Sequence, residues 1–128
     1  MKIAVDINVL VRIITGDNIA MAAKAQNLVK KYGPKEIFIA YGAILETYYV
    51  LTTVYGFSKE KALAAIEDTL KVEQFNCEHE VSIHLALAKA GKGFSFNDAL
   101  LGEIGGARGI KTHTFDKGLK HNKNFEMI

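Results

Sequence analysis

The chain has 128 residues, of which 49% are hydrophobic and 23% are charged, a balance typical of one folded domain with a sizeable core. This composition excludes a disordered, a collagen-like or a multidomain protein, so we expect a single domain over residues 1–128. The net charge of +2 is too small to indicate a nucleic-acid or membrane partner by itself.

In chain order, short apolar runs typical of strands alternate with longer segments whose apolar residues recur at helical spacing. In the first part of the chain we predict strands at residues 3–5 and 36–40, and helices at residues 9–14, 19–32, 42–55 and 59–72. Gly33 with Pro34, and later Gly56, mark helix ends, and Ser58 is a suitable N-cap for the helix that follows it. Asp6 falls at the end of the first strand.

The second part of the chain continues the alternation. We predict strands at residues 73–77, 111–114 and 125–128, the last at an edge of the sheet, and helices at residues 79–90 and 97–107. Strand and helix patterns compete over residues 79–90, where the length and the alanines favour a helix. Asp98 lies in the first turn of the last predicted helix, and Asp116 follows the strand predicted at residues 111–114.

Strands that alternate with helices predict right-handed βαβ crossovers. The fold class is therefore α/β, with a three-layer α/β/α sandwich around a central, mainly parallel sheet. In such sheets ligands bind beyond the carboxyl ends of the strands. Because Asp6 and Asp116 both follow predicted strands, the pattern directs attention to one edge of the domain.

The chain carries no signal for membrane insertion or secretion. Its longest uncharged apolar stretch, residues 37–45, is well short of the roughly 20 residues that a membrane span needs. The apolar N-terminal run contains Asp6 and has no small-residue cleavage site after it, so we interpret it as part of the fold. The single cysteine, Cys77, cannot form an intramolecular disulfide, which favours a reducing compartment, and we expect a cytoplasmic protein.

Four acidic residues lie in contexts that do not resemble a solvated face. Asp6 interrupts IAVDINVLV, Glu46 is the single acid in AYGAILETYYVL, Asp98 opens an apolar helix in FSFNDALLGEIGG, and Asp116 closes the strand in THTFD. Each also has a structural interpretation: Asp6 and Asp98 as helix caps, Glu46 as an outward-facing helix residue, and Asp116 as a turn residue. Because two follow strands and two lie in helices able to flank those strand ends, we expect all four to converge on one pocket.

A pocket of four carboxylates limits the possible chemistry. Two carboxylates about 5 Å apart repel by roughly 3 kcal/mol at an effective dielectric constant of about 20. They must protonate, separate or bind cations, and all-oxygen ligands select hard divalent ions such as Mg²⁺ or Mn²⁺. Such ions meet phosphate oxygens, so phosphoryl chemistry is the natural reaction class. Asn8 and Thr114 are polar neighbours able to orient a carboxylate, whereas structural hydrogen bonding is the favoured interpretation for Ser95 and Asn97.

The segment AVDINVLVR, the isolated Glu46, the stretch FNDALL and the closing THTFDK resemble, in order and approximate spacing, the four acidic signatures of a PIN domain. The resemblance covers nearly the whole chain and is greatest to the toxins of bacterial and archaeal VapBC toxin–antitoxin pairs. It implies a Mg²⁺- or Mn²⁺-dependent ribonuclease with Asp6, Glu46, Asp98 and Asp116 in its acidic site. It also implies a homodimer, and a small antitoxin protein that holds the toxin inactive.

The resemblance assigns roles to individual residues. The direct metal ligands would be Asp6, Asp98 and Asp116. Asn8 and Thr114 would support them. The chain departs mildly from the family at Ile7, where a small hydroxyl residue is common, and at Asn97, where a small residue often precedes the third acid. Neither departure removes a carboxylate, so the resemblance still predicts activity.

An RNA substrate also needs cations around the acidic site. The candidate cations are Arg12, Arg108, Lys111, Lys117, Lys120 and Lys123. Arg12 and Lys117 are the candidates nearest in sequence to Asp6 and Asp116. The segment 117–123 (KGLKHNK) is the most basic of the chain, and its alternative interpretation is an exposed, solubilising turn.

Other α/β folds that transfer phosphoryl groups fit less well. A haloacid-dehalogenase-like phosphatase requires a second Asp two residues after the first, where this chain has Asn8, and a response-regulator receiver requires neighbouring acids that are missing. No Walker-type glycine loop is present. The alternative from a different class is a catalytically silent PIN-like scaffold that binds RNA or protein. The presence of all four acids argues against it.

Overall fold

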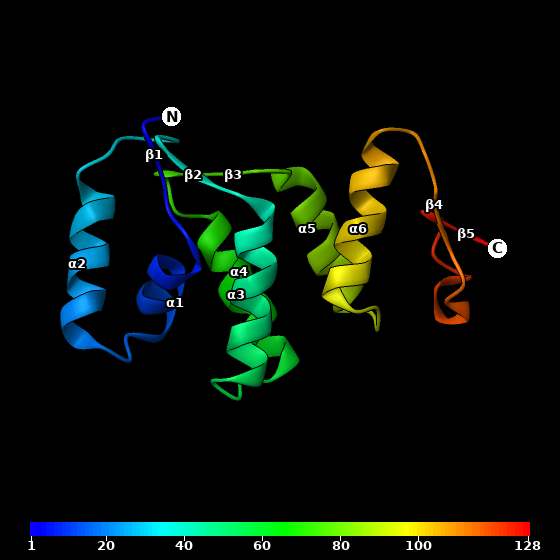
Figure 1. Ribbon diagram of the computed structural model, residues 1–128, viewed down its shortest axis with the longest axis horizontal. Helices are drawn as coiled ribbons and strands as arrows, with labels where there is room; N and C mark the ends of the chain where they lie inside the picture. The colour runs from blue at the N-terminus through cyan, green and yellow to red at the C-terminus, as the bar shows by residue number, and fades with distance from the viewer. The chain divides into compact units, whose positions relative to one another are not determined.

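The computed structural model describes all 128 residues, Met1–Ile128. The chain divides into two compact units, unit 1 with Met1–Glu80 and unit 2 with Val81–Ile128, and Figure 1 follows both along the chain by colour. Helices alternate with strands, and every strand pair is parallel. The predicted α/β class with parallel strands is therefore confirmed, whereas a single three-layer sandwich and a single domain would involve both units together and stay predictions.

Unit 1 contains three strands and four helices. They are β1 (Ile3–Ala4), α1 (Ile7–Thr15), α2 (Ile19–Lys30), β2 (Ile37–Ile39), α3 (Tyr41–Thr53), α4 (Lys59–Leu70) and β3 (Phe75–Cys77). The strands form one parallel sheet in the order β1-β2-β3, with Ile3 opposite Ile37 and Ile37 opposite Phe75. Two helices connect each strand to the next, as a parallel pairing requires, because the chain must return to the same end of the sheet.

The core of unit 1 lies between this sheet and its helices. Ile37 and Ile39 of β2 are fully buried while Phe38 between them is partly exposed, so alternation along the strand buries one face. In Figure 1 the strands of unit 1 lie at the top of the view and its helices extend below them. Leu10 of α1 and Ile66 of α4 are among the buried residues that the helices contribute.

Side-chain caps explain where the helices of unit 1 begin. The prediction for α1 began at residue 9, two residues too late, because the Asp6 carboxylate accepts hydrogen bonds from the following backbone and starts the helix at Ile7. Ser58 caps α4, as predicted. The helix α3 has no side-chain cap of its own; instead Glu78, after β3, accepts a hydrogen bond of 3.1 Å from the backbone N–H of Tyr41. Packing between strand ends therefore supplies a cap that local sequence does not.

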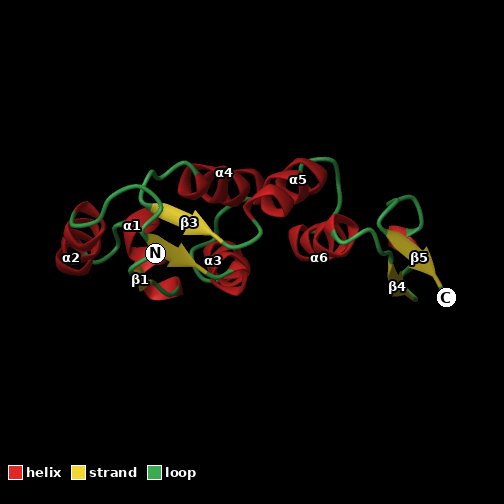
Figure 2. Ribbon diagram, turned by 90° about the horizontal axis from the view of Figure 1, so that it is seen from above, coloured by secondary structure: helices red, strands yellow, loops and turns green.

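Unit 2 contains two helices followed by two strands. They are α5 (Glu80–Ala90), α6 (Phe96–Ala107), β4 (Thr112–Thr114), the short 3-10 helix η1 (Lys117–Leu119) and β5 (Phe125–Met127). The helix α5 confirms the choice of a helix over a strand for residues 79–90. The strands β4 and β5 pair in parallel, with Thr112 opposite Phe125 (Figure 2). All predicted helices and strands of both units are present, with ends within two residues of the predicted ones.

A glycine-lined face of α6 allows β4 and β5 to approach this helix closely. A Cβ atom on Gly102 would lie 2.5 Å from the Phe125 ring, and one on Gly106 would lie 2.6 Å from Oδ1 of Asn124. Gly102 lies against both Asn124 and Phe125, and a Cβ atom on Gly105 would lie 3.0 Å from Oγ1 of Thr112, so β4 begins beside the last turns of α6. From there β4 leads back toward the end of unit 2 at which α6 begins (Figure 1).

No helix of the chain is both long enough and apolar enough to span a bilayer.

The substitution Gly102→Ala tests this close approach. We expect a net loss of about 1–2 kcal/mol of unfolding free energy, because overpacking outweighs the roughly 1 kcal/mol that alanine gains over glycine in a helix. Gly42→Ala in α3 is the matched control, since nothing lies within 4 Å of its Cβ position, and it should be neutral or stabilising. Urea unfolding measures both variants, and an unchanged midpoint for Gly102→Ala would contradict the packing described here.

Candidate functional site

Unit 1 carries two of the four predicted acids, Asp6 and Glu46. Asp6 is the N-cap of α1, just beyond the carboxyl end of β1, and Glu46 lies in the second turn of α3, which begins just beyond the carboxyl end of β2. Because β1 and β2 are parallel, their carboxyl ends lie at the same edge of the sheet. Both acids are exposed there.

The Asp6 carboxylate is oriented by the backbone that follows it. Its Oδ1 accepts hydrogen bonds from the N–H groups of Asn8 at 3.0 Å and Val9 at 3.4 Å. The capping interpretation of Asp6 is thus confirmed, and both hydrogen bonds use Oδ1 and not Oδ2. Asn8 contacts Asp6 through its backbone, while its side chain is exposed and lines a hollow between α1 and α2.

Unit 2 carries the other two acids, Asp98 and Asp116. Asp98 is partly buried in the first turn of α6, but the N-cap of that helix is Ser95, whose hydroxyl accepts a hydrogen bond of 3.1 Å from the backbone N–H of Asp98. The structural interpretation of Ser95 is confirmed. The alternative interpretation of Asp98 as a helix cap is wrong, because Ser95 is the N-cap and Asp98 is the third residue of the helix.

Asp116 lies in the turn that follows β4. Its Oδ1 accepts a hydrogen bond of 2.8 Å from the N–H of Gly118, and its own N–H donates to Oγ1 of Thr114 at 3.0 Å. The turn interpretation of Asp116 is confirmed. Thr114 is the neighbour that holds the turn against β4, and Lys117 is exposed at the start of η1. Since β4 runs toward the first turn of α6, Asp98 and Asp116 lie at the same end of unit 2.

Each unit therefore brings its own two acids to the carboxyl ends of its strands. The structure shows no group of three or more His, Cys, Asp or Glu side chains placed to hold a metal ion. Convergence of all four acids would join both units and stays a prediction. The donor chemistry nevertheless fits a hard divalent cation, because every candidate ligand is a carboxylate.

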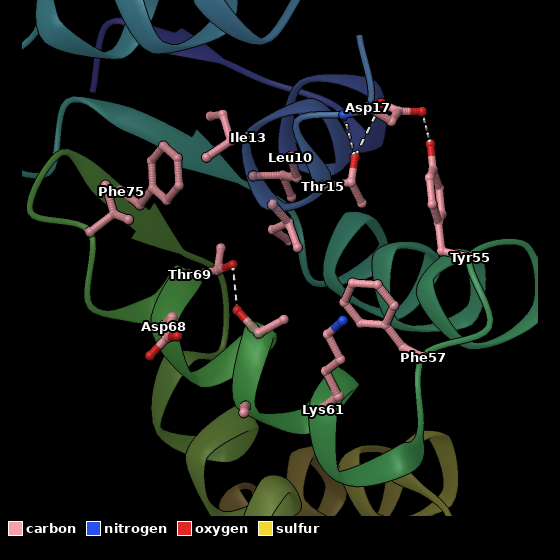
Figure 3. A pocket seen from close by; sticks show the side chains of 14 residues that line it. Leu10, Ile13, Thr15, Asp17, Tyr55, Phe57, Lys61, Asp68, Thr69 and Phe75 are labelled. Atoms are coloured by element: carbon pink, nitrogen blue, oxygen red, sulfur yellow. Dashed lines mark hydrogen bonds between the residues drawn. The ribbon is translucent and has the colours of Figure 1, made fainter. Parts of the chain in front are cut away.

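Arg12, predicted to contact RNA, is instead engaged within unit 1. Its Nη1 lies 2.7 Å and 2.9 Å from the two carboxylate oxygens of Asp17, and the hydroxyl of Tyr55 donates to Oδ2 of Asp17 at 2.6 Å. Thr15 donates a further hydrogen bond to Oδ1 of Asp17 at 3.1 Å (Figure 3). The sequence analysis missed this cluster, which ties the loop after α1 to the loop after α3.

These contacts change the acidity of both charged groups. The hydrogen bond from Tyr55, followed by that from Arg12, lowers the pKa of Asp17 from its ordinary value of 3.8 to about 2. The same carboxylate raises the pKa of Arg12. The guanidinium of Arg12 therefore binds Asp17 within unit 1 and is less available to contact RNA.

A hollow of unit 1 is separate from the four acids. It has a volume of about 600 Å³ and is bounded mainly by α1, α4 and the segment that joins α3 to α4. Figure 3 shows apolar side chains such as Leu10, Ile13 and Phe75 around it, with Asp17 and Tyr55 at its rim. At the same rim, Nζ of Lys61 lies 4.1 Å from the centre of the Phe57 ring.

The alternation of helices and parallel strands, with acids at the strand ends, defines an α/β protein with a potential acidic site. The chain belongs to the PIN domain family, whose model matches residues 3–124 and so spans both units. Among solved structures it is similar to Mycobacterium tuberculosis VapC20, a toxin that cleaves the sarcin-ricin loop, at 18% sequence identity and a TM-score of 0.45. That alignment covers 93% of this chain and 92% of the other. No curated protein matches the sequence.

The substitution Tyr55→Phe tests the origin of the low pKa of Asp17. Loss of the hydroxyl removes the largest cause of the shift, so the pKa of Asp17 should rise from about 2 toward its ordinary value of 3.8. A carboxyl group with a lowered pKa stabilises the folded state at pH values above its ordinary pKa of 3.8, and this stabilisation is lost as the pH falls toward 2. Between these pH values the variant should therefore lose less unfolding free energy than the wild type.

NMR titration of the Asp17 carboxyl carbon measures the pKa, and acid unfolding measures the stability. Tyr49→Phe is the matched control, because Tyr49 is 66% exposed on α3 and has no hydrogen bond to Asp17. A pKa of Asp17 that is the same in Tyr55→Phe and in the wild type would show that the hydroxyl is not its cause.

Proposed function

We propose that this protein is a metal-dependent endoribonuclease that cleaves RNA phosphodiester bonds through Asp6, Glu46, Asp98 and Asp116. One observation carries the proposal: in a chain of the PIN domain family, each unit presents two acids at the carboxyl ends of its parallel strands. The proposed site consists of these four acids. Lone carboxylates would repel one another there, so the site requires a cation.

Asp6, Asp98 and Asp116 are the residues that would hold Mg²⁺ or Mn²⁺. When bound, such an ion polarises a scissile phosphate and lowers the pKa of a water molecule. The chain prepares two of these carboxylates for a ligand. Oδ1 of Asp6 and of Asp116 accepts hydrogen bonds from the backbone, which restrains each carboxylate and leaves Oδ2 for a cation.

The remaining acid, Glu46, would have a different role. It is exposed on α3, its backbone is held in the middle of a helix, and its side chain has room to reach a water molecule. We propose that Glu46 orients the attacking water or accepts its proton, a role that Asp116 could share. In-line attack on the phosphate would leave a 3′-hydroxyl and a 5′-phosphate.

Unit 2 supplies the cations for an RNA chain. Residues 81–128 contain seven Lys and Arg against four Asp and Glu, and one of those acids, Glu103, is already paired with Lys89. The exposed cations that follow α6 are Arg108, Lys111, Lys117, Lys120 and Lys123. We propose Lys117 as a phosphate contact because it directly follows Asp116, whereas the ion pair of Arg12 with Asp17 makes Arg12 the weaker candidate.

The resemblance of the acidic signatures to VapC-type toxins supports a finer assignment. We propose that the protein is the toxin of a toxin–antitoxin pair, that it is cytoplasmic, that it forms a homodimer and that a small antitoxin protein inhibits it. The alternative is a catalytically silent PIN-like scaffold that binds RNA or protein. Retention of all four acids at the strand ends favours the enzyme.

The variant Asp98→Asn tests the enzyme against the scaffold. It removes one negative ligand at nearly constant volume, so we expect cleavage of an RNA pool in Mn²⁺ to fall by at least about 100-fold with no loss of fold. Asp68→Asn, at an exposed acid of α4, is the matched control and should cleave normally. Gel analysis with end mapping measures both, and EDTA should abolish wild-type cleavage.

Cleavage that persists in EDTA, or ends that carry a cyclic phosphate, would contradict the metal-dependent mechanism. A folded wild-type protein that binds Mn²⁺ and RNA without cleaving any RNA of the pool would favour the scaffold.

The variant Lys117→Ala tests the phosphate contact. Loss of one such contact should weaken RNA binding by up to about tenfold at low salt and reduce the slope of log affinity against log salt by about 1. Lys30→Ala, at the exposed end of α2, is the control. Fluorescence anisotropy with a labelled RNA between low and moderate salt measures the slope. A slope equal to that of the wild type would show that Lys117 makes no phosphate contact.

A further inference from the structure

Unit 2 contains a buried polar cluster that none of the four acids belongs to. We call it the Glu103 cluster, and it consists of Lys89, Glu103, Asn122 and Asn124. Glu103 is 7% exposed, Asn122 3% and Asn124 8%. Lys89 of α5 lies 3.0 Å from Oε1 of Glu103, and Nδ2 of Asn124 donates to Oε2 of Glu103 at 3.2 Å. Both oxygens of one buried carboxylate are thus used, one toward α5 and one toward the segment before β5.

Burial makes these contacts hard to replace. A carboxylate removed from water is unfavourable unless a cation and hydrogen-bond donors satisfy it, and loss of one partner leaves the others buried without compensation. Glu103 therefore restricts the segment before β5 to positions in which Asn124 can reach it. The glycine-lined face of α6 acts in the same direction, because Gly106 leaves space for Oδ1 of Asn124.

A continuous chain of hydrogen bonds leads from this cluster to Asp116. The backbone N–H of Asn124 donates to Oδ1 of Asn122 at 3.0 Å. The N–H of Asn122 donates to the carbonyl of Leu119 at 3.0 Å, and the N–H of Leu119 donates to the carbonyl of Asp116 at 3.1 Å. Oδ1 of Asn122 also accepts a hydrogen bond of 3.5 Å from Nζ of Lys89 on α5, whereas the attachment to α6 runs through Asn124 and Glu103.

We propose that Glu103 and Asn124 are positioning residues that hold Asp116 at a set distance from Asp98. Glu103 lies on the same helix as Asp98, one and a half turns further along, and the hydrogen-bond chain fixes the turn of Asp116 relative to that helix. Both residues are buried, and neither is among the proposed metal ligands or RNA contacts. This inference rests on the proposed nuclease function, since the two acids it positions are half of the proposed site.

Amide hydrogen exchange tests the positioning without any need for activity. In Glu103→Leu, the amides of Leu119 and Asn122 should exchange at least about tenfold faster than in the wild type, because their segment is no longer anchored to α6. Glu103→Gln keeps an oxygen for Asn124 and should retain most of the protection. Glu126→Leu, the same change at an exposed acid of β5, is the matched control.

A double variant separates positioning from stability. Lys89→Met combined with Glu103→Leu removes both charges and should recover the unfolding free energy that Glu103→Leu loses. It does not restore an acceptor for Asn124, so the fast exchange of Leu119 and Asn122 should persist. If Glu103→Leu does not fold, Asn124→Ala removes the same hydrogen bond and provides the same comparison.

Activity gives the second readout. We expect Glu103→Leu and the double variant to lose at least about tenfold in kcat with KM for RNA nearly unchanged, since only the acids are displaced. Protected amides in folded Glu103→Leu or Asn124→Ala would overturn the proposal, as would recovery of kcat along with stability in the double variant. A wild-type protein without metal-dependent cleavage would instead remove the proposed function, while the exchange result would still decide whether the cluster anchors the turn.

Discussion

Parallel strand pairing is the constraint on which the rest of this structure depends. Parallel strands end at the same edge, so every residue that follows a strand is delivered to one end of its sheet. In unit 1 this places Asp6 and the start of α3 together beyond β1 and β2. In unit 2 the glycine-lined face of α6 lets β4 return close along the helix, which brings Asp116 to the end where Asp98 lies. The strand topology by itself therefore places these acids near one another, without any contact between their side chains.

Folding roles and chemical roles are compatible at these acids. Asp6 starts α1 and Asp116 shapes the turn after β4, and each uses Oδ1 for the backbone. A carboxylate has a second oxygen, so a cap fixes its direction without consuming it. A capping interpretation of an acid at a strand end is therefore no argument against a metal-binding one.

The helices and strands could be predicted well from the sequence, because the signals that define them lie close to them in the chain. Apolar spacing, glycines and caps such as Ser58 lie within a few residues of the elements they define, and the helices and strands appear where they were expected. The predicted start of α1 is two residues late, because the cap that Asp6 provides begins the helix at Ile7. The cap that Glu78 gives α3 joins residues 37 positions apart, and no local pattern could indicate it.

The candidate site was only partly predictable for the same reason. The ion pair of Arg12 with Asp17 spans five residues, but the hydroxyl that completes it comes from Tyr55, 38 residues further on. Glu103 did carry a signal: it is an acid within an apolar, glycine-rich helix, the context that singled out Glu46. Its partner Asn124 lies 21 residues away, so the sequence could indicate an unusual acid without saying what satisfies it.

The acids discussed above fall into two groups that differ in how the protein compensates their charge. Asp17 and Glu103 each have a cation within 3.0 Å, from Arg12 and Lys89, and further hydrogen-bond donors, so the fold itself satisfies them. The four predicted site acids receive backbone hydrogen bonds at most and no protein cation within their own unit. Acids held in place by a fold that gives them no cation are suited to bind one from solution. That contrast, more than the number of acids, is the physical reason to expect a metal ion at the strand ends of this protein.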